Sequence, residues 1–115
     1  MNNLKIEFSD LSAGSKKIVA DSITCFNLEG VNWDGKPLTF DVDVKKGEVQ
    51  ALWCGVQIPE NAKAGTYRGQ LTVSAEGIEP QVVDVAIKVR SELLADRGES
   101  DLWRMARLGW LNSQI

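Results

Sequence analysis

The chain has 115 residues, of which 43% are hydrophobic and 25% charged, and its formal net charge is -3. This length predicts one domain around a single hydrophobic core. The acidic balance argues against nucleic-acid binding, which needs a clustered excess of lysine and arginine. The chain also has no histidine, which removes the Ser-His and Cys-His nucleophile pairs and the commonest metal ligand.

The first predicted strand begins close to the N-terminus. Leu4, Ile6 and Phe8 alternate with charged residues, which is the period of a strand with one buried face. The opening MNNLKIEF lacks the basic region and apolar stretch of a signal peptide, and a chain that begins after its natural signal would look the same. No apolar run approaches the roughly 20 residues that a membrane helix needs, so we expect no membrane span.

The middle of the chain predicts a succession of short strands. Residues 17–28 carry apolar side chains of both parities, which indicates a central strand or a bulge that shifts the register midway. Asp34 and Gly35 predict a type I′ hairpin turn, in which both central residues must accept positive φ. Strands with alternating apolar positions are expected over 38–44 and 49–58.

A polar loop beginning at Pro59 separates the last two strands from the others. Pro59 stops the preceding strand because it has no amide proton for the ladder. Tyr67 opens the next strand, and we expect its hydroxyl to tether the loop before it. The clearest alternation runs over 83–89. About seven short strands with turn signals between them predict an all-β fold, an immunoglobulin-like antiparallel β-sandwich over residues 1–90.

The tail follows a different pattern. Residues 91–100 are predicted to be a polar linker, and residues 101–115 a short C-terminal helix. This helix is apolar on nearly all sides, with Leu102, Trp103 and Trp110 among its residues, and a small sandwich could cover only one of those sides. We therefore expect the helix to belong to, or dock onto, a second domain absent from this sequence.

The sequence offers little that could carry out a reaction. The predicted strand over 38–44 would place Asp41 and Asp43 on one face, about 7 Å apart, a separation compatible with two-carboxylate glycoside hydrolysis. Any solvated strand face shows such a spacing, so a structural role is favoured for both. The glycines punctuate strands and form neither a phosphate loop nor a dinucleotide fingerprint. We predict no catalytic residue and no cofactor in this chain.

The two cysteines allow two interpretations. Cys25 and Cys54 are 29 positions apart, with no CxxC motif. Buried free thiols are the favoured interpretation, and a disulfide between strands is the alternative. A zinc site is excluded, because two distant thiols without histidine cannot supply four ligands.

The four tryptophans are candidate contact residues. Trp33 lies at a predicted hairpin tip, where its indole could stack on a sugar ring; alternatively, it folds back over Pro37 and covers the end of the sandwich. Trp53 has the parity opposite to the core-facing residues of its strand, which places it in a second apolar layer or under a neighbouring domain. Trp103 and Trp110 are seven positions apart and share a helical face, for which packing is favoured over a ligand platform.

Two segments carry a family resemblance. The segment LWCGVQIPENAKAGTYRGQLTVSAEG contains the pattern W-x-G-x-x-x-P-x-x-A-x-x-G-x-Y-x-G and resembles accessory sandwiches of Bacteroidetes polysaccharide-degrading enzymes. The tail LLADRGESDLWRMARLGWLNSQI looks like the junction found in the glycoside hydrolase family 123-like group, where a β-sandwich leads into the catalytic barrel. The resemblance covers residues 51–115, and the tail is its more specific part.

The resemblance implies a parent protein that acts on glycans in the periplasm or at the cell surface, with its catalytic carboxylates in the barrel beyond Ile115. The leading hypothesis is a non-catalytic accessory domain, packed against the catalytic domain of the same polypeptide. Its candidate interface residues are Trp53, Leu102, Trp103 and Trp110. The second hypothesis is a carbohydrate-binding module that holds a polysaccharide with Trp33. The third is a free-standing adhesion or assembly sandwich that dimerises through its tail helix.

Overall fold

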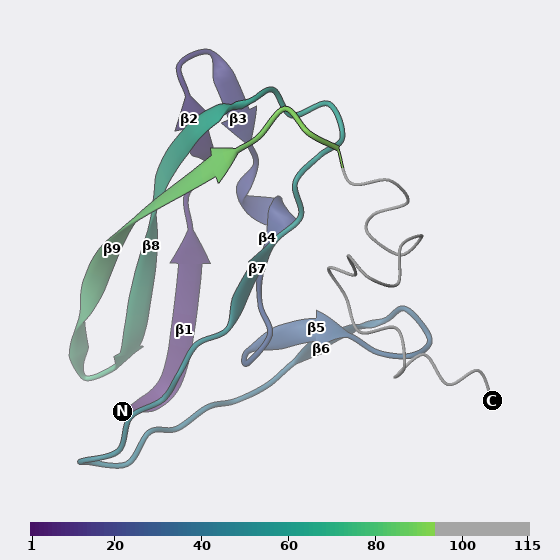
Figure 1. The fold of residues 1–115 in the computed structure, drawn as a ribbon. Helices are drawn as coiled ribbons and strands as arrows, with labels where there is room; N and C mark the ends of the chain where they lie inside the picture. The colour runs from purple at the N-terminus through teal and green to yellow at the C-terminus, as the bar shows by residue number, and fades with distance from the viewer. Residues whose placement is uncertain (94–115) are drawn as a thin grey trace.

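The computed structural model describes residues 1–93, and this part of the chain is built from β-strands (Figure 1). Its elements are β1 (Asn2–Phe8), β2 (Leu11–Ala13), β3 (Lys16–Ile18), the 3₁₀ helix η1 (Ala20–Ser22), β4 (Ile23–Cys25), β5 (Glu29–Val31), β6 (Pro37–Thr39), β7 (Cys54–Val56), β8 (Gly65–Glu76) and β9 (Ile78–Val89). The all-β prediction is confirmed. Within residues 1–93, no helix is long and apolar enough to cross a membrane.

Most of the predicted C-terminal tail lies outside residues 1–93. Most of the linker predicted over 91–100 and the whole helix predicted over 101–115 lie beyond the described residues. Leu102, Trp103 and Trp110 lie there too. Their assignment to an interface therefore stays a prediction.

Strand β8 pairs with three of the other four strands of the large sheet. It pairs with β9 along one edge, in an antiparallel hairpin that turns at Gly77 with φ 72°. Along its other edge it pairs first with β1 and then with β2, and β3 extends the sheet beyond β2. Figure 1 shows β9, β8 and β1 side by side, with the β2–β3 hairpin at one end of the sheet. The two remaining sheets, β4–β7 and β5–β6, have two strands each.

A corner at Ser9 separates β1 from β2. The Ser9 amide donates to the Gln70 carbonyl at 2.8 Å, and the Ser9 hydroxyl oxygen accepts from the Gln70 amide at 2.8 Å. A side chain thus replaces a main-chain acceptor where the ladder bends. Gly69 faces this corner, and a Cβ atom there would lie 2.7 Å from the Asp10 carbonyl oxygen. The bend therefore depends on glycine at this position of β8.

The Asp10 carboxylate holds the segment that follows the corner. Its Oδ1 accepts from the Ala20 amide at 2.8 Å, and its Oδ2 pairs with Lys17 Nζ at 2.8 Å. The hydrogen bond from Lys17, and then that from Ala20, lowers the pKa of Asp10 below its usual value. The ionised carboxylate therefore ties β3 and η1 to the end of β1.

The core is a small apolar cluster drawn from four strands. Leu11, Ile18, Ile23 and Tyr67 form its buried centre. Half-buried apolar residues packed against this cluster are Phe8, Ala13, Val56, Ile58, Val85, Ile87 and Val89. Tyr67 is 1% exposed, and its hydroxyl donates to the Lys63 carbonyl at 2.8 Å. The predicted tether between Tyr67 and the loop before β8 is confirmed.

The mixed parity of residues 17–28 reflects a break in the chain. Helix η1 interrupts the segment between β3 and β4, so the two strands have independent side-chain phases. Ile18 and Ile23, which lie on opposite parities, are both buried as a result. The expectation of one continuous central strand is wrong, and a midway change of register describes the segment better.

Residues 40–53 form no strand, contrary to the alternation seen in the sequence. The predicted strands on either side shrink to the three-residue β6 and β7. The segment is instead held against the N-terminus: the Val44 amide donates to the Met1 carbonyl at 2.7 Å, and the Leu4 amide donates to the Val42 carbonyl at 3.1 Å. Val44 and Leu4 are buried. The alternating pattern therefore marks a segment that contacts the N-terminus around Val42 and Val44 without forming a regular ladder.

The turn between β5 and β6 also differs from its prediction. Gly35 has φ 80°, but Asp34 does not have positive φ, so a type I′ turn is excluded. The Gly35 amide donates to the Asn32 carbonyl at 3.0 Å, and the Asn32 amide donates to the Lys36 carbonyl at 2.8 Å. This is the pattern of a three-residue loop whose last residue is a left-handed glycine. Trp33 is the first residue of that loop.

Replacing Gly69 with alanine should lower the free energy of unfolding by about 1–3 kcal/mol, the usual cost of overpacking. The new Cβ would lie 2.7 Å from a backbone oxygen that cannot swing away. Gly30→Ala is the matched control, because a Cβ there has no neighbour within 4 Å, and we expect a change within about 0.5 kcal/mol. Urea unfolding followed by circular dichroism measures both. Equal effects would contradict the role given to the corner.

The lowered pKa of Asp10 predicts a pH-dependent contribution to stability. A carboxylate with a depressed folded-state pKa stabilises the fold above its unfolded value, which is about 3.9, and this contribution is lost as pH falls through the folded-state pKa. The unsubstituted chain should therefore be more stable than Asp10→Asn above about pH 5, and the difference should shrink as the pH falls below about 4 and through the lowered pKa of Asp10. Urea titrations across this range measure the difference. A difference that stays constant with pH would show that the Asp10 charge is not responsible.

Candidate functional site

Trp33 lies at the tip of the β5–β6 hairpin, as predicted, and its side chain is 94% exposed. The loop beneath it is braced: the Trp33 amide donates to Asn32 Oδ1 at 2.7 Å, and Lys36 Nζ pairs with Asp34 Oδ2 at 2.8 Å. The hydrogen bond from Lys36 lowers the pKa of Asp34. The alternative in which Trp33 folds over Pro37 and covers the end of the sandwich is wrong, because a covering indole could not be so exposed. The hairpin presents the indole to solvent.

A second exposed aromatic group lies on the outer face of the β4–β7 sheet. The Phe26 amide donates to the Trp53 carbonyl at 2.9 Å, which continues the β4–β7 register by one pair and sets the two side chains on the same face. The Phe26 ring lies over Gly55, where a Cβ atom would be 2.7 Å from it. We call Phe26, Trp53 and Gly55 the aromatic face. The Trp53 amide also donates to Asn27 Oδ1 at 2.6 Å.

The aromatic face is exposed in the described part of the chain. Trp53 is 75% exposed and Phe26 is 55% exposed. The alternative that buried Trp53 in a second apolar layer of this chain is therefore wrong. The other alternative, a place under a neighbouring domain, stays a prediction.

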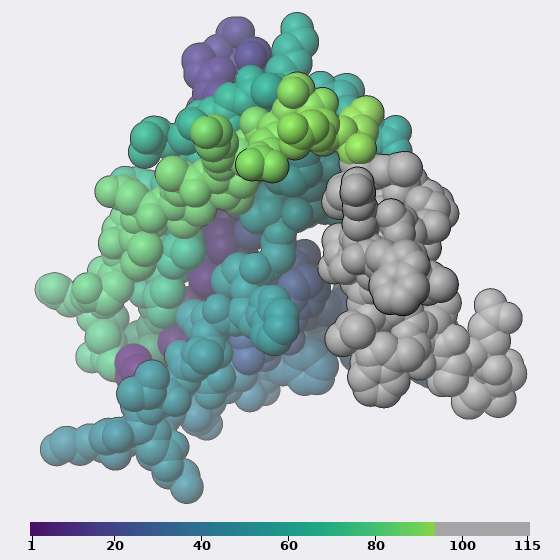
Figure 2. All heavy atoms as spheres, in the orientation of Figure 1, coloured from purple at the N-terminus to yellow at the C-terminus, as the bar shows by residue number. Residues whose placement is uncertain are grey.

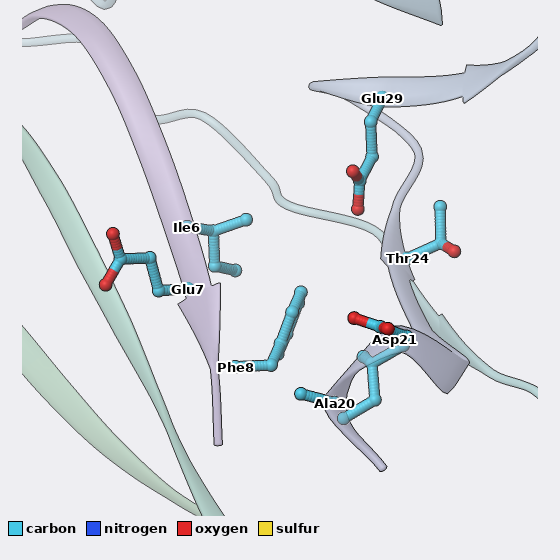
Figure 3. A pocket seen from close by; sticks show the side chains of 8 residues that line it. Ile6, Glu7, Phe8, Ala20, Asp21, Thr24 and Glu29 are labelled. Carbon is cyan, nitrogen blue, oxygen red and sulfur yellow. The ribbon is translucent and has the colours of Figure 1, made fainter. Parts of the chain in front are cut away.

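A cavity of about 520 Å³ opens between β1 and the segment that runs from η1 to β5 (Figure 3). Its lining residues are Ile6, Glu7, Phe8, Ala20, Asp21, Ile23, Thr24 and Glu29. Figure 3 shows Phe8 and the Asp21 and Glu29 carboxylates around a common space, whereas Glu7 points to the other side of β1. Glu29 Oε1 also accepts from the Cys25 amide at 3.3 Å.

The chemistry of this cavity is that of a contact site. An aromatic ring and carboxylate oxygens can receive hydroxyl groups, but with no histidine in the chain there is no imidazole to activate a nucleophile. Within residues 1–93, no group of three or more histidine, cysteine, aspartate or glutamate residues could hold a metal ion.

Asp41 and Asp43 do not form the carboxylate pair that the sequence suggested. They lie in the strand-free segment over 40–53, so the spacing taken from a strand does not apply. Both are exposed, and Asp43 Oδ1 accepts from the Asn3 amide at 2.9 Å. Asn3 has φ 52°, a left-handed conformation that Asp43 helps to hold. These contacts support the structural interpretation of Asp43.

The two cysteines lie directly opposite each other on β4 and β7. Both are free thiols; Cys25 is buried and Cys54 is half-buried. Burial, and then the neighbouring Cys25, raises the pKa of the Cys54 thiol to about 11. At neutral pH the Cys54 thiol is therefore protonated, and it lies opposite Cys25 on the inner face of the sheet.

Sequence reasoning missed two features of this surface. The cavity is lined by residues from three separate segments, and its existence depends on the distance between layers, which no local pattern encodes. The partner of Trp53 was missed because Phe26 follows a three-residue strand whose register could not be foreseen. A usable signal was Gly55, a glycine inside a strand, which often marks a close approach of another group.

Comparisons with known proteins agree with this architecture. A family 123 glycoside hydrolase from Clostridium perfringens, solved to study glycolipid glycan hydrolysis, has a similar fold with a TM-score of 0.62 and 22% sequence identity. The similarity covers 82% of this chain and 19% of that enzyme, so this chain spans about a fifth of its length. No curated protein matches the chain.

The sequence profile described as "Glycoside hydrolase 123 N-terminal domain" matches residues 16–75. The matched region runs from β3 into β8 and includes the β5–β6 hairpin, the aromatic face and both cysteines. Since it spans more than half of the chain, the chain belongs to the glycoside hydrolase 123 N-terminal domain family.

Proposed function

We propose that this chain is a non-catalytic accessory domain of a larger glycoside hydrolase and that it packs against the catalytic domain of the same polypeptide. Membership of an N-terminal domain family of glycoside hydrolase 123 is the observation that carries the proposal. The share of the similar enzyme that this chain covers, 19%, leaves room for a separate catalytic domain. Catalysis is assigned to that domain, and none to this chain.

The aromatic face is the proposed contact with the catalytic domain. Most of the glycines and the tyrosine of the pattern W-x-G-x-x-x-P-x-x-A-x-x-G-x-Y-x-G have a role inside this domain. Gly55 makes room for the Phe26 ring, Gly69 for the corner, and Tyr67 tethers the loop. Trp53 is different, because its indole is 75% exposed. A large apolar side chain that is held next to strand β7 by backbone hydrogen bonds and left in water is suited to burial by a partner.

We also propose roles for the C-terminal tail, most of which lies beyond the described residues. The linker over 91–100 and the helix over 101–115 lead toward the catalytic domain, and Leu102, Trp103 and Trp110 join Trp53 in the interface. Without that domain, the same apolar residues would promote self-association. The native location is the periplasm or the cell surface.

The immunoglobulin-like class of the sandwich is also part of the proposal. Its support is the Tyr67 hydroxyl, which donates to a carbonyl four residues upstream at the start of a long strand. A tyrosine in this position is typical of immunoglobulin-like folds.

A second candidate function is carbohydrate binding through Trp33. The observation that favours it is the exposure of this indole, 94%, on a loop held by two local contacts. A rigid exposed aromatic ring can stack on the apolar face of a sugar at low entropic cost. The proposed ligand is a polysaccharide.

Trp53→Ser should lower the free energy of unfolding of this domain by about 2 kcal/mol or more within the intact enzyme, because a buried interface tryptophan is lost. In the chain studied alone the same change should stay within about 0.5 kcal/mol, since the indole is already exposed. Chemical denaturation of both forms gives the comparison. Trp33→Ser is the matched control and should be neutral in both. Equal effects of Trp53→Ser in the two forms would refute an interface at the aromatic face.

If Trp33 binds glycan, Trp33→Ala should weaken the affinity for a polysaccharide by about 5- to 100-fold, which corresponds to the loss of about 1–3 kcal/mol of aromatic contact. Isothermal titration of the chain against a polysaccharide panel measures this affinity. Trp53→Ala is the control and should bind as the parent does. No heat with any member of the panel would leave the accessory role as the one function proposed.

A further inference from the structure

The pairing of β4 with β7 brings Cys25 and Cys54 into register as direct cross-strand partners. The type of pair follows from the hydrogen bonds on either side. Gln57 donates its amide to the Ser22 carbonyl at 2.8 Å, and Phe26 donates to the Trp53 carbonyl at 2.9 Å. In an antiparallel ladder, hydrogen-bonded pairs alternate with non-hydrogen-bonded pairs. Phe26 and Trp53 form a hydrogen-bonded pair, so the adjacent pair, Cys25 and Cys54, is a non-hydrogen-bonded one.

This position suits a covalent link. Directly opposed residues of a non-hydrogen-bonded pair have Cα atoms about 4.5 Å apart, and their side chains approach more closely than in the other type of pair. A disulfide needs Cα atoms between about 4.4 and 6.8 Å apart. The influence of Cys25 on the Cys54 thiol, through charge and a hydrogen bond, agrees with two adjacent sulfurs. The ideal separation of such a pair therefore lies within the range that a disulfide spans.

We propose that Cys25 and Cys54 form a structural disulfide when this chain folds in the presence of a low-molecular-weight disulfide such as oxidised glutathione. One cysteine thiolate attacks a sulfur of the small disulfide, which gives a mixed disulfide and releases one glutathione thiol. The second cysteine, as its thiolate, attacks the protein sulfur of the mixed disulfide and releases the second glutathione. Two cysteine thiols lose two protons and two electrons, and one small disulfide is reduced to two thiols.

The disulfide would close a loop formed by residues 26–53, which connect β4 to β7. Residues 26–53 leave the sheet after β4 and return to it at β7, and they carry the β5–β6 hairpin with Trp33 at its tip (Figure 1). Phe26 directly follows Cys25, and Trp53 directly precedes Cys54. A disulfide would therefore fix the spacing of the aromatic face and restrict the unfolded freedom of the hairpin segment.

The environment of the thiols fits a link made during folding. Cys25 is 0% exposed in the folded chain, and the pKa of Cys54 is raised to about 11 by burial and by Cys25. A buried thiol with a raised pKa holds little thiolate at neutral pH and reacts slowly with outside reagents. Once the sandwich has folded in a reducing medium, the thiols should persist for long periods.

The test refolds the chain from denaturant with either a glutathione redox buffer or dithiothreitol. In the glutathione buffer we expect a monomer that has lost two hydrogen atoms by intact mass and that takes up no N-ethylmaleimide in denaturant. Peptide mapping should find one linked peptide that contains Cys25 and Cys54. The oxidised form should melt at least about 5 °C above the reduced form.

Cys54→Ala is the control, because it removes the less buried thiol and keeps the core residue Cys25. Its melting temperature should be the same in both refolding buffers. Two maleimide-reactive thiols in the parent after glutathione refolding would overturn the proposal, and so would a disulfide found only between two chains. Equal melting temperatures of a linked and a reduced parent would remove the structural role.

Discussion

Strand β8 is the element on which the rest of the fold depends, because it forms ladders with β9, β1 and β2. One strand can serve β1 and β2 in succession only if the chain bends between them at low cost. Gly69 permits the bend by offering no Cβ, and Ser9 supplies the missing acceptor with its hydroxyl. Tyr67 then inserts the start of β8 into the core and ties it to the loop before it. Glycine and tyrosine two positions apart thus perform separate tasks on one strand.

The core that results is small for the length of chain it serves. In residues 1–93, the buried side chains are Leu4, Leu11, Ile18, Ile23, Cys25, Val44 and Tyr67. Large apolar side chains that are more than half exposed include Val31, Trp33, Phe40, Val49 and Trp53. Figure 2 shows the turn of the β8–β9 hairpin, in green, and the segment between β6 and β7, in blue-green, projecting from the body of the molecule. The proposed accessory role would account for such a surface, since a partner domain would supply the burial that this core lacks.

The sequence predicted the features that depend on local chemistry. The tether of Tyr67, the hairpin tip at Trp33 and the all-β class each follow from one side chain or from alternation over a few residues. The type of the turn at Asp34 and Gly35 was not predictable in this way, because a dipeptide does not reveal how many residues the loop contains. The strand-free course of residues 40–53 was hidden too, since the hydrogen bonds of Val42 and Val44 to the N-terminus hold a short stretch of the segment as a ladder would.

The pairing register of the strands was the property least predictable from local sequence pattern, and the candidate site depends on it. The face that Trp53 occupies could be read from parity, but its partner Phe26 could not, because β4 follows a 3₁₀ helix that resets its phase. The same pairing sets Cys25 against Cys54 on the inner face of the sheet. The two proposals made for this chain therefore meet at the short β4–β7 ladder. Its inner side can lock the two strands together, and its outer side presents aromatic groups whose positions are then fixed relative to the core. A domain that supports a neighbour needs this combination, because an interface residue on a loose segment would lose in conformational entropy much of what it gains in contact.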